Sequence, residues 1–318
     1  MSTPAILQSY ALRSGAKMPA LGFGTWQAPP GLVAKSVDVA IASGMRHIDC
    51  AAVYGNEAEI GAKFTEIFKA GAVKREDLFI TSKLWNNAHH PEDVEAACRR
   101  TLKDLQLEYL DLYLIHWPIA FQRGPVRIPA DEKTGGTHQA DVPIVDTWKA
   151  MEKLVDAGLV RNIGVCNYNE AQLRETFEAA RIKPACHQIE VQPALANDEI
   201  RAVNKELGIV TTGYCPLGVG IFGARDVFTF KEPEFVAIAE KHNVGSASLA
   251  LQWNLQSGNV VLTKSLAPAR IAENAATPIG ALSAEAMAEV DAYGATVSKR
   301  VCNPGMFFAT AGPFFAPH

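Results

Sequence analysis

Short apolar runs alternate with amphipathic stretches along almost the whole chain. In the amphipathic stretches, Ala, Leu, Glu and Lys recur every three to four residues, as in NEAEIGAKFTEIFKAG and IVDTWKAMEKLVDAG, and this spacing predicts helices. Eight apolar runs have the length of buried strands: 20–24, 46–49, 78–82, 111–116, 162–166, 186–190, 209–214 and 259–263. This alternation predicts parallel strands joined by helical crossovers.

Residues typical of helix ends agree with this reading. Pro91 stands where a first helical turn should begin, and Asn169 stands at an N-cap position. Three glycines, Gly71, Gly158 and Gly208, follow helical patterns, where a left-handed residue commonly ends a helix. The segments between the apolar runs therefore have predictable ends.

Eight strand–helix units predict a closed (β/α)8 barrel, the TIM barrel of the α/β class, formed as a single domain by residues 1–318. The alternative is an open doubly wound sheet, which would be expected to carry G-x-G-x-x-G after an early strand. The candidate GFGTWQ at 22–27 lacks the third glycine and runs into PPG instead of a helix. The barrel is therefore the preferred prediction.

Two connections are too long for simple crossovers. One runs from Trp117 to about Ile144, after the fourth strand, and the other from Leu217 to about Glu232, after the seventh. Both should lie at the C-terminal face of the barrel, which carries the active site in barrel enzymes. The tail 302–318 contains four phenylalanines, and we expect it to pack over the barrel mouth because large aromatic side chains are usually buried. The alternative is a disordered chain end.

Charge and composition exclude several classes of protein. The 318-residue chain has a net charge of −4, which gives no indication of binding to nucleic acid or to an anionic membrane. No apolar run approaches the roughly 18 residues of a spanning helix, and the N-terminus does not resemble a signal peptide. The six cysteines form no C-x-x-C pair, which is typical of reduced thiols. We therefore expect a cytoplasmic protein, and nothing in the sequence demands more than a monomer.

Polar residues stand at the C-terminal ends of the predicted strands, where barrels carry functional groups. Each one alone could be a satisfied structural group, but eight strand ends meet at one rim. The set comprises Asp49, Lys83, His116, Asn167, Gln188, Glu190, Tyr214 and Lys264. The convergence predicts an active site.

Tyr54 follows Asp49 closely and suggests a chemistry. Lys83 next to Asp49 should keep its charge, and the cation should lower the pKa of Tyr54, which is otherwise a poor acid near pH 7. His116 could bind the same substrate oxygen. This group suits protonation of a carbonyl oxygen during hydride delivery, and the hydride requires a cofactor because no side chain can supply one.

Lys264, Ser265 and Arg270 surround the start of a predicted helix that is entered through Pro268. A helix N-terminus with two cations is an anion site. Two cations suit the 2′-phosphate that distinguishes NADP from NAD. A surface cluster of salt bridges at a helix start is the alternative interpretation.

From about residue 10 to 302 the sequence resembles the aldo-keto reductase family. The resemblance is carried by GMRHIDCAAVYGNEAEIG (44–61), LYLIHWP (112–118) and LTKSLAPARIAEN (262–274). It implies an NADPH-dependent oxidoreductase that reduces aldehydes or ketones. Tyr54 is the implied proton donor, Asp49 and Lys83 tune it, and His116 orients the carbonyl.

The resemblance also implies a cofactor bed, a substrate pocket and no metal. Asn167 and Gln188 match positions that bind the nicotinamide carboxamide, and Tyr214 matches the residue that stacks on the ring. The full cofactor set is Thr25, Trp26, Asp49, Cys166, Asn167, Gln188, Tyr214, Leu217, Lys264, Ser265, Arg270, Glu273 and Asn274. The substrate set is Trp26, Trp85, His116, Trp117 and Phe121. The implied substrate is a small carbonyl compound whose identity the sequence leaves open.

Five positions depart from the family pattern: Cys50, Cys166, Cys215, Thr263 and Ala267. Thiols hydrogen-bond poorly, so we expect weaker NADPH binding than is typical of the family. The three cysteines could form an oxidation-sensitive group near the cofactor. The preferred alternative is that they are small, buried and inert.

Three other functions are alternatives to carbonyl reduction. A metal hydrolase could use His47, Asp49, His116 and Glu190, but Lys83 would then place a cation near the metal. A cofactor-sensing module with vestigial activity would not need the complete catalytic group. Reduction of a C=C bond is the third, and relatives that catalyse it tend to have glutamate in place of the histidine at 116.

Overall fold

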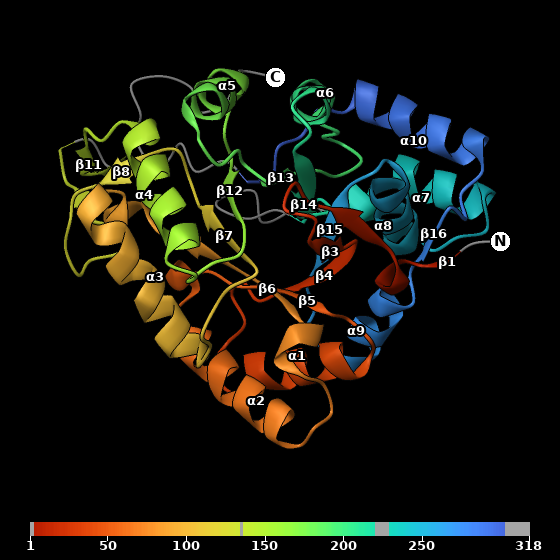
Figure 1. Cartoon of the computed structure of the whole chain (residues 1–318). Helices are drawn as coiled ribbons and strands as arrows, with labels where there is room; N and C mark the ends of the chain where they lie inside the picture. Colours follow the sequence, from red (N-terminus) through yellow and green to blue (C-terminus); the bar gives the residue numbers. More distant parts are fainter. Residues whose placement is uncertain (1–2, 134–135, 220–228, 303–318) are drawn as a thin grey trace.

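The computed structural model describes residues 3–133, 136–219 and 229–302, and its centre is a closed parallel barrel (Figure 1). The barrel strands are β4 (Leu21–Gly24), β5 (His47–Asp49), β6 (Phe79–Leu84), β7 (Leu112–Ile115), β12 (Ile163–Cys166), β13 (Cys186–Glu190), β14 (Val210–Tyr214) and β15 (Val260–Thr263). Strand β15 pairs with β4 and closes the ring. All eight predicted strands are confirmed, and the open-sheet alternative is wrong.

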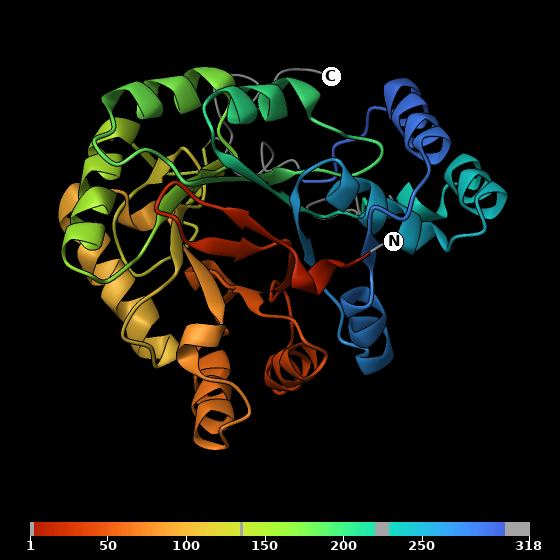
Figure 2. The ribbon, with the colours of Figure 1, turned by 45° about the vertical axis from the view of Figure 1, so that its right-hand side comes forward.

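Helices surround the barrel, as the view in Figure 2 shows. They are α1 (Val33–Ala42), α2 (Glu57–Lys69), α3 (Pro91–Leu105), α4 (Ile144–Asp156), α5 (Glu170–Ala179), α6 (Asp198–Glu206), α7 (Pro233–Lys241), α8 (Ser246–Gln256), α9 (Pro268–Ala275) and α10 (Ala284–Thr296). The predicted ends are confirmed: Pro91 is the first residue of α3, and Asn169 caps α5 in a reciprocal pair with Gln172. Gly71, Gly158 and Gly208 have positive φ values.

A hairpin that the sequence pattern did not predict covers the N-terminal end of the barrel. It consists of β2 (Ser9–Ala11) and β3 (Lys17–Pro19). Leu12 and Met18 are buried against Phe79, Leu112 and Val260, which are the first residues of β6, β7 and β15. The hairpin therefore closes the end of the barrel where the strands begin. An open site must lie at the other end, the C-terminal face.

The two long connections lie where they were predicted. The first contains two short antiparallel pairs, β8 (Ala120–Phe121) with β11 (Gln139–Ala140), and β9 (Ala130–Asp131) with β10 (Gly136–Thr137). The second ends in the 3-10 helix η5 (Thr229–Lys231), and its residues 220–228 lie outside the described part of the chain. The tail after Cys302 also lies outside it, so its packing over the barrel mouth stays a prediction.

The remaining elements are short. The two-residue strands β1 (Thr3–Pro4) and β16 (Pro278–Ile279) pair with each other at the barrel exterior. The other 3-10 helices are η1 (Ala5–Leu7), η2 (Ala52–Tyr54), η3 (Arg75–Asp77) and η4 (Asn86–Ala88). Across the ranges that the structure describes, no helix combines the length and apolarity needed to cross a membrane.

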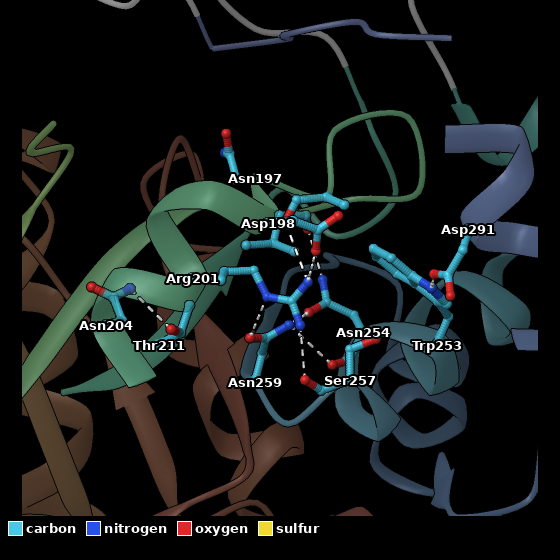
Figure 3. Close-up of polar contacts among 12 residues, drawn as sticks. Asn197, Asp198, Arg201, Asn204, Thr211, Trp253, Asn254, Ser257, Asn259 and Asp291 are labelled. Atoms are coloured by element: carbon cyan, nitrogen blue, oxygen red, sulfur yellow. Dashed lines mark hydrogen bonds and ion pairs between the residues drawn. The ribbon is translucent and has the colours of Figure 1, made fainter. Parts of the chain in front are cut away.

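Polar side chains tie the end of β13 to helices α6 and α8 (Figure 3). Arg201 on α6 donates from Nε to Asn259 Oδ1 at 3.2 Å and from Nη2 to the Ser257 carbonyl at 2.8 Å. Asn259 donates to Asn254 Oδ1 at 2.9 Å, and Asn254 Nδ2 donates to the Val191 carbonyl at 2.7 Å. These hydrogen bonds therefore hold the backbone immediately after β13 in place, at the rim where functional residues are expected.

Candidate active site

Four predicted catalytic residues meet at the C-terminal rim of the barrel. Asp49 ends β5, Lys83 lies near the end of β6, His116 follows β7, and Tyr54 ends η2. Asp49 accepts hydrogen bonds from Lys83 Nζ at 2.5 Å and from Gln188 Nε2 at 2.9 Å. The neighbouring parallel strands place these side chains together although they are far apart in sequence.

Tyr54 lies between the lysine and the histidine. The Lys83 ammonium nitrogen is 5.3 Å from the centroid of the Tyr54 ring. The rings of Tyr54 and His116 meet edge to face, with centroids 5.9 Å apart. The phenol therefore has a cation on one side and an imidazole on the other.

The buried Lys83–Asp49 pair is ionic. Burial lowers the pKa of Lys83, but Asp49 and Tyr54 favour the ammonium and the pKa is raised overall. Lys83 also donates to the Cys50 carbonyl at 2.9 Å, which satisfies a second ammonium proton. The prediction that Lys83 keeps its charge is confirmed.

The expectation that Lys83 gives Tyr54 a lowered pKa is wrong for this structure. Burial raises the pKa of Tyr54, and Lys83 only partly opposes that shift, so the pKa is raised overall. The physical reason is that the phenolate would lose its hydration, and one nearby cation does not replace it. Tyr54 therefore carries its proton, as a donor must.

His116 is held as a neutral imidazole. Burial, then the nearby charges of Lys83 and His89, lower its pKa well below the ordinary value. Its amide donates to the Leu84 carbonyl at 3.1 Å, and its carbonyl accepts from Asn167 Nδ2 at 3.0 Å. A neutral imidazole can donate one N–H to a ligand oxygen without adding a charge.

The candidate nicotinamide residues form a connected group beside this centre. Asn167, which has a left-handed φ of 61°, accepts from the Tyr214 hydroxyl at 2.7 Å. Gln188 binds Asp49, and Thr25 donates to the Asp49 carbonyl at 2.9 Å. The structure thus brings together polar groups from β4, β5, β12, β13 and β14.

Three aromatic side chains form a buried cluster next to His116, and we call them the aromatic wall: Trp85, Trp117 and Phe121. The Trp85 ring centroid lies 5.2 Å from that of His116 and 5.9 Å from that of Phe121. The Trp117 ring stacks on His116 at 6.3 Å. The buried cluster that contains the wall also includes Cys302 but not Trp26, which lies partly buried in the loop after β4.

Sequence reasoning missed the residues that support this wall. Trp85 donates from Nε1 to the Arg127 carbonyl at 2.6 Å, and the Arg127 guanidinium reaches the Val53 carbonyl at 3.3 Å. Cys302 and the partly buried Ile119 pack in the same cluster. These residues lie in loops without periodicity, and the only sequence signal was the length of the connection that carries Arg127.

The predicted phosphate site lies at the start of α9. Ser265 Oγ accepts from the Ala267 amide at 3.2 Å and from Arg270 Nε at 3.3 Å. Within the described ranges, neither Lys264 nor Arg270 pairs with a carboxylate, so a mutually neutralised salt-bridge cluster is not what the structure shows. Uncompensated positive charge at a helix N-terminus fits a phosphate.

Three other predicted cofactor positions lie on α9 and in the turn after β14. Glu273 and Asn274 lie on α9 three and four residues after Arg270, so all three share one helix face. Leu217 lies in the turn after β14 and packs against the main core. The resemblance implies adenine contacts for Glu273 and Asn274 and a pyrophosphate contact for Leu217, and these roles stay predictions.

The residues of the metal-hydrolase alternative do not form a ligand set. Among residues that the structure describes, no three His, Cys, Asp or Glu side chains form a group suited to a metal ion. His47 lies inside the barrel, 3.0 Å from Thr81 Oγ1, and burial lowers its pKa to about 4. Glu190 binds backbone amides instead. His47 is buried against Thr81 and Phe79, which is the environment of a packing residue.

The cysteines near the site are poor nucleophiles. Cys50 and Cys166 are buried, and Cys215 is partly buried. Burial raises the pKa of each thiol well above its ordinary value, which disfavours the reactive thiolate. This supports the alternative in which the three are inert.

The buried Glu57, which lies in the same motif as Tyr54, should make the stability of the protein depend on pH. It is buried on α2, where its carboxyl group accepts hydrogen bonds from Ser82 Oγ at 2.5 Å and Thr101 Oγ1 at 3.1 Å. Burial raises its pKa to about 7. The folded state therefore retains a proton that the unfolded chain releases, and stability falls as pH rises between about 4.5 and 7.

We expect Glu57→Gln to remove this dependence. The stability of the variant relative to the wild type should rise by up to about 3 kcal/mol between pH 4.5 and pH 8. Urea unfolding at several pH values measures the difference. A difference between the two proteins that does not change with pH would contradict the assignment.

Comparison with known proteins agrees with the geometry of the site. Residues 20–295 match the Aldo/keto reductase family. Aldo-keto reductase family 1 member A1 of Cricetulus griseus is 46% identical over 286 residues, covering 88% of each chain. The protein of the same name from Gallus gallus is 46% identical over 285 residues, covering 88% of this chain and 86% of that protein.

Two solved structures have the same fold. The aldose reductase of Schistosoma japonicum aligns with a TM-score of 0.89 and 38% identity, covering 98% of this chain and all of that one. The aldose reductase of Giardia lamblia aligns with a TM-score of 0.86 and 40% identity, covering 93% and 97%. The resemblance seen in the sequence is therefore confirmed over nearly its full length, and the chain belongs to the aldo/keto reductase family.

Proposed function

We propose that this enzyme reduces aldehydes or ketones to alcohols with NADPH as the hydride donor. The observation that carries the proposal is the position of the protonated Tyr54 between the Lys83 ammonium and the neutral His116 imidazole. Such a group can donate two hydrogen bonds to one carbonyl oxygen. The complete group disfavours a cofactor sensor, and the intact His116 disfavours C=C reduction.

The residues would act as follows. NADPH, when bound, supplies a hydride to the carbonyl carbon. His116 donates an N–H to the carbonyl oxygen and fixes its direction, and Tyr54 gives that oxygen its hydroxyl proton. Lys83 stabilises the resulting phenolate, and Asp49 holds Lys83 in place. Solvent then returns a proton to Tyr54.

The donor set fits the cofactor. The amides of Asn167 and Gln188 suit a nicotinamide carboxamide, and the partly buried Tyr214 ring offers a stacking surface. Lys264 and Arg270 have no carboxylate partner among the residues that the structure describes, and two such cations suit a 2′-phosphate. The relatives named aldose reductase indicate that aldoses belong in any test of substrates.

The proposed function is tested by following NADPH oxidation with a panel of aromatic, aliphatic and sugar aldehydes and simple ketones. We expect turnover with aldehydes and an alcohol as the product. NADPH binding without turnover would favour the sensor, and saturation of an enone with its carbonyl left intact would favour C=C reduction.

Lys264→Met should weaken NADPH binding about tenfold to a hundredfold, because a hydrogen bond to a charged group contributes roughly 1.5–3 kcal/mol. The dissociation constant of NADH should change less than twofold, since NADH lacks the 2′-phosphate. Fluorescence titration with both cofactors measures this. Lys205→Met, on the exposed face of α6, is the matched control, and equal losses for NADPH and NADH would refute the phosphate assignment.

A further inference from the structure

Glu190 does not take part in the proposed chemistry, yet it is a buried carboxylate at the barrel mouth. It ends β13 and is 1% exposed. Its Oε1 accepts the Val301 amide at 2.9 Å, and its Oε2 accepts the Cys302 amide at 2.9 Å. The carboxylate thus binds two consecutive amides from a segment more than a hundred residues away in sequence.

Gln192 extends this attachment to a second segment. Its Nε2 donates to the Lys299 carbonyl at 2.7 Å, and its Oε1 accepts from the Ala194 amide at 2.9 Å and from Thr229 Oγ1 at 3.0 Å. Gly218 passes so close that an added Cβ would lie 2.7 Å from this Oε1 and 2.1 Å from Thr229 Oγ1. One amide therefore joins 299–302 to the chain that follows β14.

The backbone that carries both side chains is itself fixed. The Val191 carbonyl accepts from Asn254 at 2.7 Å, through the polar contacts of Figure 3. The Glu190 carbonyl accepts from Asn197 Nδ2 at 2.6 Å. Two anchored attachment points leave little freedom for the segment that they bind.

The attached segment forms part of the candidate substrate pocket. Cys302 is 3% exposed and packs with Trp85, Trp117 and Phe121, the aromatic wall. The Tyr214 side chain packs against the same cluster. The position of Cys302 therefore influences how tightly the aromatic wall packs beside the catalytic residues.

We propose that Glu190 and Gln192 are positioning residues for substrate specificity. They fix 299–302 as a side of the carbonyl pocket and couple it to Gly218 and Thr229, in the connection after β14. The inference rests on the proposed function. It concerns binding of the carbonyl compound and not proton or hydride transfer, because neither residue has a hydrogen bond with Tyr54, Lys83 or His116 within the described ranges.

Glu190→Gln is the sharpest variant. A glutamine can accept only one of the two amide protons, and its own NH₂ then faces the other amide, so one attachment is lost. We expect the KM for 4-nitrobenzaldehyde to rise about tenfold, the effect of roughly 1.4 kcal/mol. The KM for glyceraldehyde should rise less, because this smaller molecule would make fewer contacts with the aromatic wall. The kcat and the NADPH dissociation constant should stay within about twofold.

The chain offers a matched control in Glu152→Gln. Glu152 is a buried carboxylate on α4 that accepts the amides of Arg181 and Ile182 at 2.7 and 2.9 Å, away from the barrel mouth. Both amides donate to one oxygen, Oε1, so a glutamine here keeps the two bonds and removes only the buried charge; both KM values should stay unchanged. If Glu190→Gln changes the two KM values no more than Glu152→Gln does, the inference is overturned.

A measurement independent of turnover separates the inference from the proposed function. The alkylation rate of Cys302 by iodoacetamide, followed by peptide mass spectrometry, should rise at least about tenfold in Glu190→Gln and in Gln192→Leu. Cys98, a buried residue of α3, serves as the internal reference and should not change. Unchanged labelling of Cys302 would refute the positioning role even in an enzyme without carbonyl reductase activity. Absence of turnover in the wild type would instead refute the proposed function alone.

Discussion

Tyr54→Phe should lower the kcat for carbonyl reduction by about 10² to 10⁴, the range typical of a lost general acid. The phenyl ring keeps the edge contact with His116 and the position over Lys83, so only the transferable proton is removed. The NADPH dissociation constant should therefore stay within about twofold. Steady-state kinetics and fluorescence titration of the same preparation measure both quantities.

Tyr168→Phe is the control for this substitution. Tyr168 is buried one residue after Asn167, and its hydroxyl has no hydrogen-bond partner among the described residues. Loss of that hydroxyl should leave kcat almost unchanged. A Tyr54→Phe enzyme that retains more than about a tenth of wild-type kcat would show that another group donates the proton.

The barrel was predictable because buried parallel strands appear as continuous apolar runs and their helices as 3.6-residue patterns. Even β5, with only His47–Asp49, was identified, because clear helical patterns flank it. The β2–β3 hairpin was not predicted, because its three-residue strands are too short to show a period. Its role depends on the distant side chains that it covers, which no local pattern contains.

The catalytic centre was predictable for a topological reason. Once the strand ends are located, a closed barrel must bring Asp49, Lys83 and His116 to one rim. The pKa of Tyr54 was not predictable, because it is the balance of burial against the charge of Lys83, and the degree of burial is a property of the whole fold. The roles of Arg127 and Cys302 were also hidden, because each is defined by a contact from a loop.

The same burial that raises the pKa of Tyr54 makes the Lys83–Asp49 pair important for folding. Lys83→Met would leave the Asp49 carboxylate buried with Gln188 as its remaining side-chain partner. We expect the free energy of unfolding to fall by about 3–5 kcal/mol, the cost of an uncompensated buried charge. Carbonyl reduction should also become undetectable, because the phenolate of Tyr54 loses its cation. Urea unfolding monitored by circular dichroism measures the first effect.

The double variant Asp49→Asn, Lys83→Met separates the two effects. Without the orphaned charge it should recover most of the lost stability, yet it should stay inactive, because neither neutral side chain can stabilise the phenolate. Arg75→Met gives the reverse pattern: it breaks the partly buried pair with Asp111, 2.7 Å apart at the start of β6, and should lower stability while preserving kcat. If the double variant regains turnover together with stability, then Lys83 supports only the fold, and the proton donor at Tyr54 works without a neighbouring cation.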